Sequence, residues 1–346
     1  MNRFSVLDAF RGIFALAIVF FHMKDYNAIT NNDFVNNSDL FVNFFFVLSG
    51  FVIAFVYYDR IKDKTSLGNF VKNRFLRLYP LHLFTLLVFA AFELSKGYLT
   101  HQGYIQNSGS SNNNALTFLY NLFLLNGTSF ATKNGLSWNY PSWSISAEFI
   151  TYMIFALLLL VARRSEVFKI IIVALIPASL ICFWKFSIYH DYVSEALIGF
   201  FLGVIVFKLR QLRAVKVSRL IATILELLIV GVTVWVVCSK ELFNDWLFLY
   251  DIFFAIAIYL FSSTDGYISG ILKGAFFQML GRYSYSIYLN HAIVIEVFNF
   301  MLVRYLKLNG MFLYFVPFII AAATIAYSSI TYKVIELRFY KRHTHR

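Results

Sequence analysis

Arginine and histidine residues interrupt apolar stretches of this chain, where charged side chains are rare. Near the N-terminus, Arg11 and His22 bracket an apolar run and are eleven residues apart. At about 100° per residue, a helix would carry both side chains on one face, about 16 Å apart. Ionisable groups inside a membrane helix are costly and are commonly functional. The structural alternative is an arginine that reaches the membrane surface and a histidine that caps the helix end.

A second cationic pair, Arg74 and Arg77, occupies positions i and i+3, so one helix face would present both guanidinium groups. Paired guanidinium groups are well suited to bidentate contacts with phosphate. We therefore predict that Arg11, Arg74 and Arg77 bind an anionic cofactor at one end of a helical bundle. A plain orientation signal in a basic loop is the alternative reading of the pair.

A carboxylate, Glu148, follows Pro141 within the first two turns of another apolar stretch. We place it at the same membrane depth as His22. A buried histidine beside a carboxylate can act as a general base, because the carboxylate raises the basicity of the imidazole and orients it. His22 and Glu148 are therefore predicted to form a catalytic pair. A hydrogen-bond network at a helix start would explain Glu148 equally simply.

Further polar residues mark a possible cavity wall. Ser284, Tyr288 and His291 stand at i, i+4 and i+7 and would share one helix face. Such a stripe suits either a cavity or hydrogen bonds between helices. Ser49 precedes a glycine, a pair that often marks close helix packing. The residues predicted to line the substrate cavity are Ser49, Trp143, Tyr288 and His291.

These side chains need a membrane-embedded scaffold to position them. Of the 346 residues, 60% are hydrophobic and only 14% are charged, whereas soluble domains are about 25% charged. Apolar runs recur at lengths that span a bilayer. We predict an all-α integral membrane protein, a bundle of about ten transmembrane helices. The predicted spans are 8–24, 40–58, 75–95, 143–162, 168–188, 191–209, 219–238, 245–262, 284–305 and 311–332.

The distribution of positive charge predicts the orientation of the bundle. The net charge is +12, but its basic residues gather in alternate loops, which argues against nucleic acid as a partner. The positive-inside rule places these loops and both termini in the cytoplasm. The segment 97–142 would then be an external loop. We expect one transmembrane domain over residues 1–346, with no separate soluble domain and no cleaved signal peptide.

The remaining ionisable residues and thiols suggest no further site. Cys182 and Cys238 lie in apolar runs and fit neither a disulfide framework nor a metal motif. Four more acids fall within predicted spans and are taken as structural. They are Glu195, Glu226, Asp251 and Glu296.

Five segments, in this order, resemble those of membrane-bound acyltransferase family 3, which includes O-antigen and exopolysaccharide O-acetyltransferases. They are Leu7–Gly12 with the following His22, Phe45–Phe51, Arg74–Pro80, Trp143–Glu148 and Tyr285–His291. The resemblance implies that Arg11, His22, Arg74 and Arg77 are needed for activity. This chain has Ala9 where the family usually has glycine, a conservative change. Many family members carry an additional soluble domain after the helices.

The resemblance also implies a reaction. Acyl-CoA, most simply acetyl-CoA, would be a cytoplasmic co-substrate, with no permanently bound cofactor. The acceptor would be a hydroxyl of a carbohydrate or glycolipid in cell-surface polysaccharide or lipopolysaccharide biosynthesis at the inner membrane. A secondary transporter or polysaccharide flippase is the main alternative, although inverted repeats and midplane helix breaks are not evident. A membrane scaffold without catalysis is a third reading. The sequence does not indicate the oligomeric state.

Overall fold

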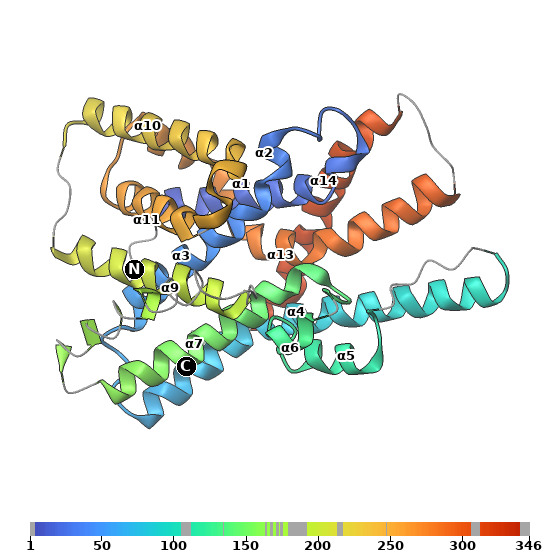
Figure 1. Ribbon diagram of the computed structural model, residues 1–346, viewed down its shortest axis with the longest axis horizontal. Coiled ribbons are helices and arrows are strands. Elements are labelled where there is room, and N and C mark those ends of the chain that lie inside the picture. The colour runs from blue at the N-terminus through green and yellow to red at the C-terminus, as the bar shows by residue number, and fades with distance from the viewer. Residues whose placement is uncertain are drawn as a thin grey trace.

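The computed structural model describes residues 4–104, 112–133, 135–162, 192–212, 217–246, 248–305 and 312–339, with scattered positions between 165 and 178. Every secondary-structure element in these residues is helical, as predicted (Figure 1). Nine of the ten predicted spans coincide with a described helix. The predicted span 168–188 lies largely outside the described residues.

The long helices are α1 (Ser5–Phe21), α3 (Phe41–Tyr57), α4 (Lys64–His101), α7 (Trp143–Val161), α9 (Tyr192–Leu212), α10 (Arg219–Cys238), α11 (Phe248–Ser263), α13 (Ala275–Phe298) and α14 (Phe312–Thr331). Short helices are α2 (Asp33–Asn36), α5 (Ala115–Leu122), α6 (Ser129–Thr132) and α12 (Tyr267–Leu272). Short 3₁₀-helical segments are η1 (Lys24–Tyr26), η2 (Ser38–Leu40), η3 (Tyr140–Ser142) and η4 (Lys240–Trp246), and π-helical segments are η5 (Asn299–Tyr305) and η6 (Tyr332–Glu336).

Seven helical segments of the described chain are long and apolar enough to cross a membrane. Helices α1 and α11 are shorter, with 17 and 16 residues. The chain is therefore a multi-pass membrane protein. The described residues do not reproduce the count of ten spans, because these two helices are short and one predicted span falls largely outside them. The count of ten and the orientation of the termini stay predictions.

Helix α4 is much longer than the predicted span 75–95. Its 38 residues reach about 57 Å at 1.5 Å per residue, against about 30 Å of bilayer hydrocarbon. A capping box starts it early: the Asp63 carboxylate accepts from the backbone N–H of Ser66 at 2.7 Å. Polar turns thus extend the apolar run at both ends. Most of the loop between the predicted spans 40–58 and 75–95 is therefore helical.

The segment predicted as the external loop 97–142 is also partly helical and packs onto the bundle. It begins in α4 and contains α5, α6 and η3. The carbonyl of Asn121 bonds the His82 imidazole at 2.8 Å. The Asn139 amide donates to Thr85 Oγ1 at 2.9 Å and to the carbonyl of Leu289 at 3.1 Å. These bonds attach the segment to α4 and α13.

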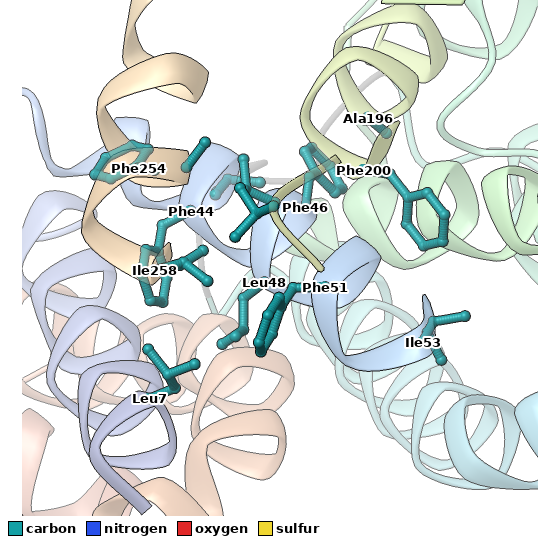
Figure 2. Packing of buried hydrophobic residues seen from close by; sticks show 14 of the residues in the cluster. Leu7, Phe44, Phe46, Leu48, Phe51, Ile53, Ala196, Phe200, Phe254 and Ile258 are labelled. Carbon is teal, nitrogen blue, oxygen red and sulfur yellow. The ribbon is translucent and has the colours of Figure 1, made fainter. Parts of the chain in front are cut away.

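Helix α3 lies at the centre of the hydrophobic core. Figure 2 shows its Phe44 and Leu48 between side chains of α1, α9 and α11, such as Leu7 and Phe254. Because α3 is surrounded, it is apolar on nearly every face, as a buried helix must be. This central position lets α3 present Ser49 to the neighbouring helices.

The contact between α3 and α9 depends on two glycines. A Cβ atom on Gly203 would lie 1.9 Å from the carbonyl oxygen of Val47, and one on Gly50 would lie 1.8 Å from that of Phe200. Glycine therefore permits a backbone approach that no other residue allows. An equally close contact joins α1 to α13, where a Cβ on Gly281 would lie 2.3 Å from the Asp8 carbonyl oxygen.

We expect Gly203→Ala to destabilise the bundle by about 1–3 kcal/mol or more, because overpacking a core usually costs this much. The clash is with backbone of α3, so side-chain rotation cannot relieve it. Gly231→Ala in α10 is the matched control, because nothing lies within 4 Å of its added Cβ. Thermal unfolding in detergent would measure both. Equal melting temperatures for the two variants would contradict the close approach.

Candidate active site

A cavity of about 160 Å³ opens between α1, α3, α4, α7 and α13. Six of the predicted site residues line it: Arg11, Ser49, Arg74, Arg77, Glu148 and Tyr288. These residues come from five helices that are far apart in sequence. The bundle therefore brings the predicted cationic groups and the predicted carboxylate to one cavity.

A larger cavity of about 700 Å³ adjoins the first and shares Arg11, Arg74 and Arg77 with it. It adds two arginines that sequence reasoning did not assign to a site, Arg60 and Arg282. Both are exposed side chains. Arg282 stands at the start of the polar run on α13, which was a usable signal, whereas Arg60 was hidden among other loop cations. The lining also includes Asp8 and Glu336, so positive charge predominates.

The three predicted arginines have different partners. Arg11 lies 3.7 Å from the Asp8 carboxylate, one turn away on α1. Arg74 donates to the Tyr57 hydroxyl at 3.3 Å and lies over its ring. Its Nε atom is buried without a hydrogen-bond partner among the described residues. Arg77 forms an ion pair with Glu336. Arg74 is thus the only one of these three without an acidic partner in the described structure.

Glu148 is held by two hydroxyl groups. Ser49 Oγ on α3 and Tyr152 OH on α7 each donate to its Oε1 at 2.5 Å. The two hydroxyl oxygens are 2.7 Å apart. Tyr152 also lines the cavity. Sequence reasoning missed Tyr152, although its position one helical turn after Glu148 gave a signal.

His22 lies outside both cavities and does not form the expected pair with Glu148. At the C-terminal end of α1, its ring stacks on His291, with centroids 5.1 Å apart and planes at 25°. Tyr140 covers it at 4.8 Å. The helix face of His22 was predicted from its spacing, but its partner is on α13 because α1 packs along α13 rather than along α7.

The histidine pair nevertheless lies close to the first cavity. The His291 ring is 5.9 Å from that of Tyr288, and the Tyr288 hydroxyl is 2.8 Å from Ser144 Oγ. Tyr288 and Ser144 both line the cavity. One tyrosine and one histidine ring therefore separate His22 from it.

The comparisons with known proteins identify the family. A profile of the acyltransferase domain matches residues 4–331. The chain belongs to acyltransferase family 3. It is similar to the acyltransferase MdmB of Streptomyces mycarofaciens, 32% identical over 126 residues, which are 36% of this chain and 30% of that protein. It is also similar to protein 2 in the picA locus of Rhizobium radiobacter, 40% identical over 92 residues, which are 26% of this chain and 46% of that protein.

The matched segments thus span less than half the length of these two relatives. No solved structure matches the chain. With the family shown, this chain is a multi-pass membrane protein of the acyltransferase family. Family membership favours an enzyme over the transporter, flippase and scaffold readings.

Two residues that we predicted to line the cavity of this family member do not line it. Trp143 instead stacks on Tyr192 of α9, with ring centroids 4.1 Å apart. The residue that follows, Ser144, does line the cavity, and a helix turns by about 100° between neighbours. His291 is fully buried and stacks on His22.

Two of the other acids within the predicted spans, Glu226 and Asp251, have hydrogen-bond partners nearby. Glu226 is fully buried and accepts from the backbone N–H of Gly266 at 2.7 Å and from Ser269 Oγ at 2.6 Å, at the start of α12. Asp251 accepts from the Asn43 amide at 3.2 Å. Both fit the expected structural role. Cys238 is a free thiol, and Cys182 lies outside the described residues. No cluster in the described residues has the ligands for a metal ion.

Proposed function

We propose that this acyltransferase moves an acyl group, acetyl in the simplest case, from cytoplasmic acyl-CoA to a carbohydrate hydroxyl. The acceptor would belong to cell-surface polysaccharide or lipopolysaccharide biosynthesis. One observation supports this most: a single cavity joins three arginines to a carboxylate held by hydroxyl groups. Such a cavity offers an anion site and a polar site within reach of one extended substrate.

The arginine-rich end suits the donor. Coenzyme A carries several phosphates, and Arg11, Arg74 and Arg77 lie where the two cavities meet. Arg60 and Arg282 add positive charge at the larger cavity. Guanidinium groups bind phosphates by charge-assisted, often bidentate, hydrogen bonds. The thioester would extend from this end toward Glu148.

The stacked pair of His22 and His291 suits the proton transfer. In the proposed step, substrate binding brings the acceptor hydroxyl past the rings of Tyr288 and His291 to within hydrogen-bond reach of His22. His22 then takes the hydroxyl proton while that oxygen attacks the thioester carbonyl. A C–O bond forms, the C–S bond breaks, and the departing thiolate takes the proton held by the protonated His22, which gives the free thiol of coenzyme A and restores neutral His22. Stacking on His291 and Tyr140 fixes the orientation of the His22 ring. Positioned general bases contribute about 10²- to 10⁴-fold to rates.

Glu148 serves the proposed reaction from the cavity itself. Its carboxylate and the hydroxyl groups of Ser49 and Tyr152 form a compact acceptor and donor set. Such groups can hold substrate hydroxyls, with Tyr288 forming part of the wall. Contact of Glu148 with substrate therefore replaces the direct assistance to His22 that the sequence suggested.

The membrane arrangement is part of the proposal. We place the chain in the inner membrane with ten spans and both termini in the cytoplasm, as the charged loops favour. The arginine-rich cavity would then open to the cytoplasm, where acyl-CoA is available. Attaching a membrane-impermeant thiol reagent to Ser66→Cys, in the first turn of α4, would test this. Labelling only after the cells are opened supports the orientation, and labelling of Ser66→Cys in intact spheroplasts refutes it.

The reaction itself can be tested with purified protein in lipid nanodiscs. Acetyl-CoA and extracted cell-surface glycolipid should together release free coenzyme A thiol, measured with a thiol-reactive dye. Mass spectrometry of surface polysaccharide from cells lacking the gene should show loss of an O-acetyl group with the polymer intact. Loss of the polymer itself would point to a flippase and overturn the proposal.

A further inference from the structure

Glu336 is a buried acid that the sequence did not single out. It lies at the end of η6, a π-helical turn that follows α14. Its side chain is only 2% exposed. A π-helical turn changes which residues face inward, and such turns are frequent at functional sites. The charge of Glu336 therefore enters the bundle at a place where the apolar pattern of α14 gives no sign of it.

Both carboxylate oxygens of Glu336 have partners. Oε2 forms the ion pair with Arg77 of α4, and Oε1 accepts from Ser286 Oγ of α13. Arg77 also lies over the ring of Tyr285, 5.2 Å from its centroid. The Tyr285 hydroxyl donates to the Leu78 carbonyl at 2.6 Å. The Arg77 guanidinium is therefore held by side chains of two other elements, η6 and α13, at the junction of the two cavities.

Arg74, one turn earlier on α4, has a different environment. Its partner is the neutral Tyr57, and no acid pairs with it among the described residues. An arginine paired to a buried carboxylate adds little net charge to the site. The charge of an arginine that is held by a tyrosine is not offset by its partner. The two arginines of this helix face thus differ in the charge that they offer to a ligand.

We propose that Glu336 is a positioning residue that holds Arg77, and that the two arginines divide their roles. Arg77, neutralised by Glu336, shapes the junction and directs its remaining N–H groups into the cavity. Arg74 supplies the uncompensated charge that binds an anionic group of the donor. This inference rests on the proposed function, because it names which residues of that site hold and which attract the acyl-CoA.

This division of roles between Arg74 and Arg77 predicts that their alanine variants differ in thermal stability. Arg77→Ala leaves the buried Glu336 unpaired, and breaking a buried pair is strongly destabilising. Arg74→Ala leaves no buried acid behind. Arg77→Ala should therefore melt at a lower temperature than Arg74→Ala, and adding Glu336→Ala to Arg77→Ala should recover part of the loss. Equal melting temperatures for the two arginine variants would overturn the division.

The kinetic test compares Glu336→Gln with Glu226→Gln in nanodiscs. Both acids are buried and accept a serine hydroxyl, but Glu226 lines neither cavity. Glu336→Gln should raise the KM for acetyl-CoA about tenfold or more, as expected when a charged contact is lost, with a smaller change in kcat per folded molecule. Glu226→Gln should leave that KM unchanged.

Two other outcomes would overturn the inference. A lower KM for Glu336→Gln would mean that Glu336 competes with the donor, and an unchanged KM would mean that it only supports folding. If Glu336→Gln does not fold, Ser286→Ala removes only the hydrogen bond from the serine hydroxyl to Glu336 and leaves the ion pair with Arg77, so it should raise the same KM more weakly. Absence of thiol release by the unaltered protein would instead refute the proposed function.

Discussion

Replacing His22 with alanine is expected to lower kcat by about 10²- to 10⁴-fold, the usual contribution of a general base. The imidazole is the group that we assign to the acceptor proton, and its ring is held against His291 at 5.1 Å. The variant should still bind acetyl-CoA, because the arginines lie at the other end of the first cavity. Thiol release in nanodiscs measures kcat, and protection by acetyl-CoA in thermal unfolding measures binding.

His101 provides a control for this substitution. It is exposed at the end of α4 and lines neither cavity. His101→Ala should keep full activity. A fully active His22→Ala protein would refute the role of His22. If His22→Ala lost acetyl-CoA binding as well as turnover, the proposal that His22 acts apart from the donor-binding arginines would be wrong.

Replacing Arg74 with alanine is expected to raise the KM for acetyl-CoA by about 10- to 150-fold. This range corresponds to about 1.5–3 kcal/mol for hydrogen bonds to a charged group, at 1.4 kcal/mol per factor of ten. Arg74 keeps its full charge, since its partner is the neutral Tyr57. Initial rates at several acetyl-CoA concentrations would give the KM. Because salt screens the charge of Arg74, 0.5 M salt should also raise the KM of the unaltered protein.

A matched control for Arg74→Ala is Arg219→Ala. Arg219 also lies over a tyrosine ring, 4.3 Å from the centroid of Tyr267, but it lines neither cavity. Its removal should leave the KM unchanged. An Arg74→Ala enzyme with normal KM and reduced kcat would show that Arg74 acts in the chemical step and not in donor binding.

Helix positions were predictable because they depend on local sequence. A run of about 20 apolar residues must form a helix in lipid, since every backbone polar group needs an internal partner. The predicted spans 40–58 and 143–162 accordingly match α3 and α7 within two residues. The length of α4 was missed because its polar turns begin at the Asp63 capping box, outside the apolar run.

Local sequence also predicted part of the candidate site. Spacing identified the helix faces of Arg74 with Arg77 and of Arg11 with His22, and the order of the segments indicated the family. Spacing along one helix, however, does not determine which helix that face will meet. His22 meets His291 and not Glu148 for this reason.

The sequence alone determined that this is a helical membrane protein of the acyltransferase family with arginines in its apolar segments, because apolar length and local motifs depend on consecutive residues. Only the tertiary structure decided which groups share a cavity. The ion pair of Arg77 with Glu336 joins residues 259 positions apart, and Ser49 of α3 reaches Glu148 of α7. Such contacts depend on glycine-mediated helix packing and on the π-helical turn at η6, which side-chain periodicity does not specify.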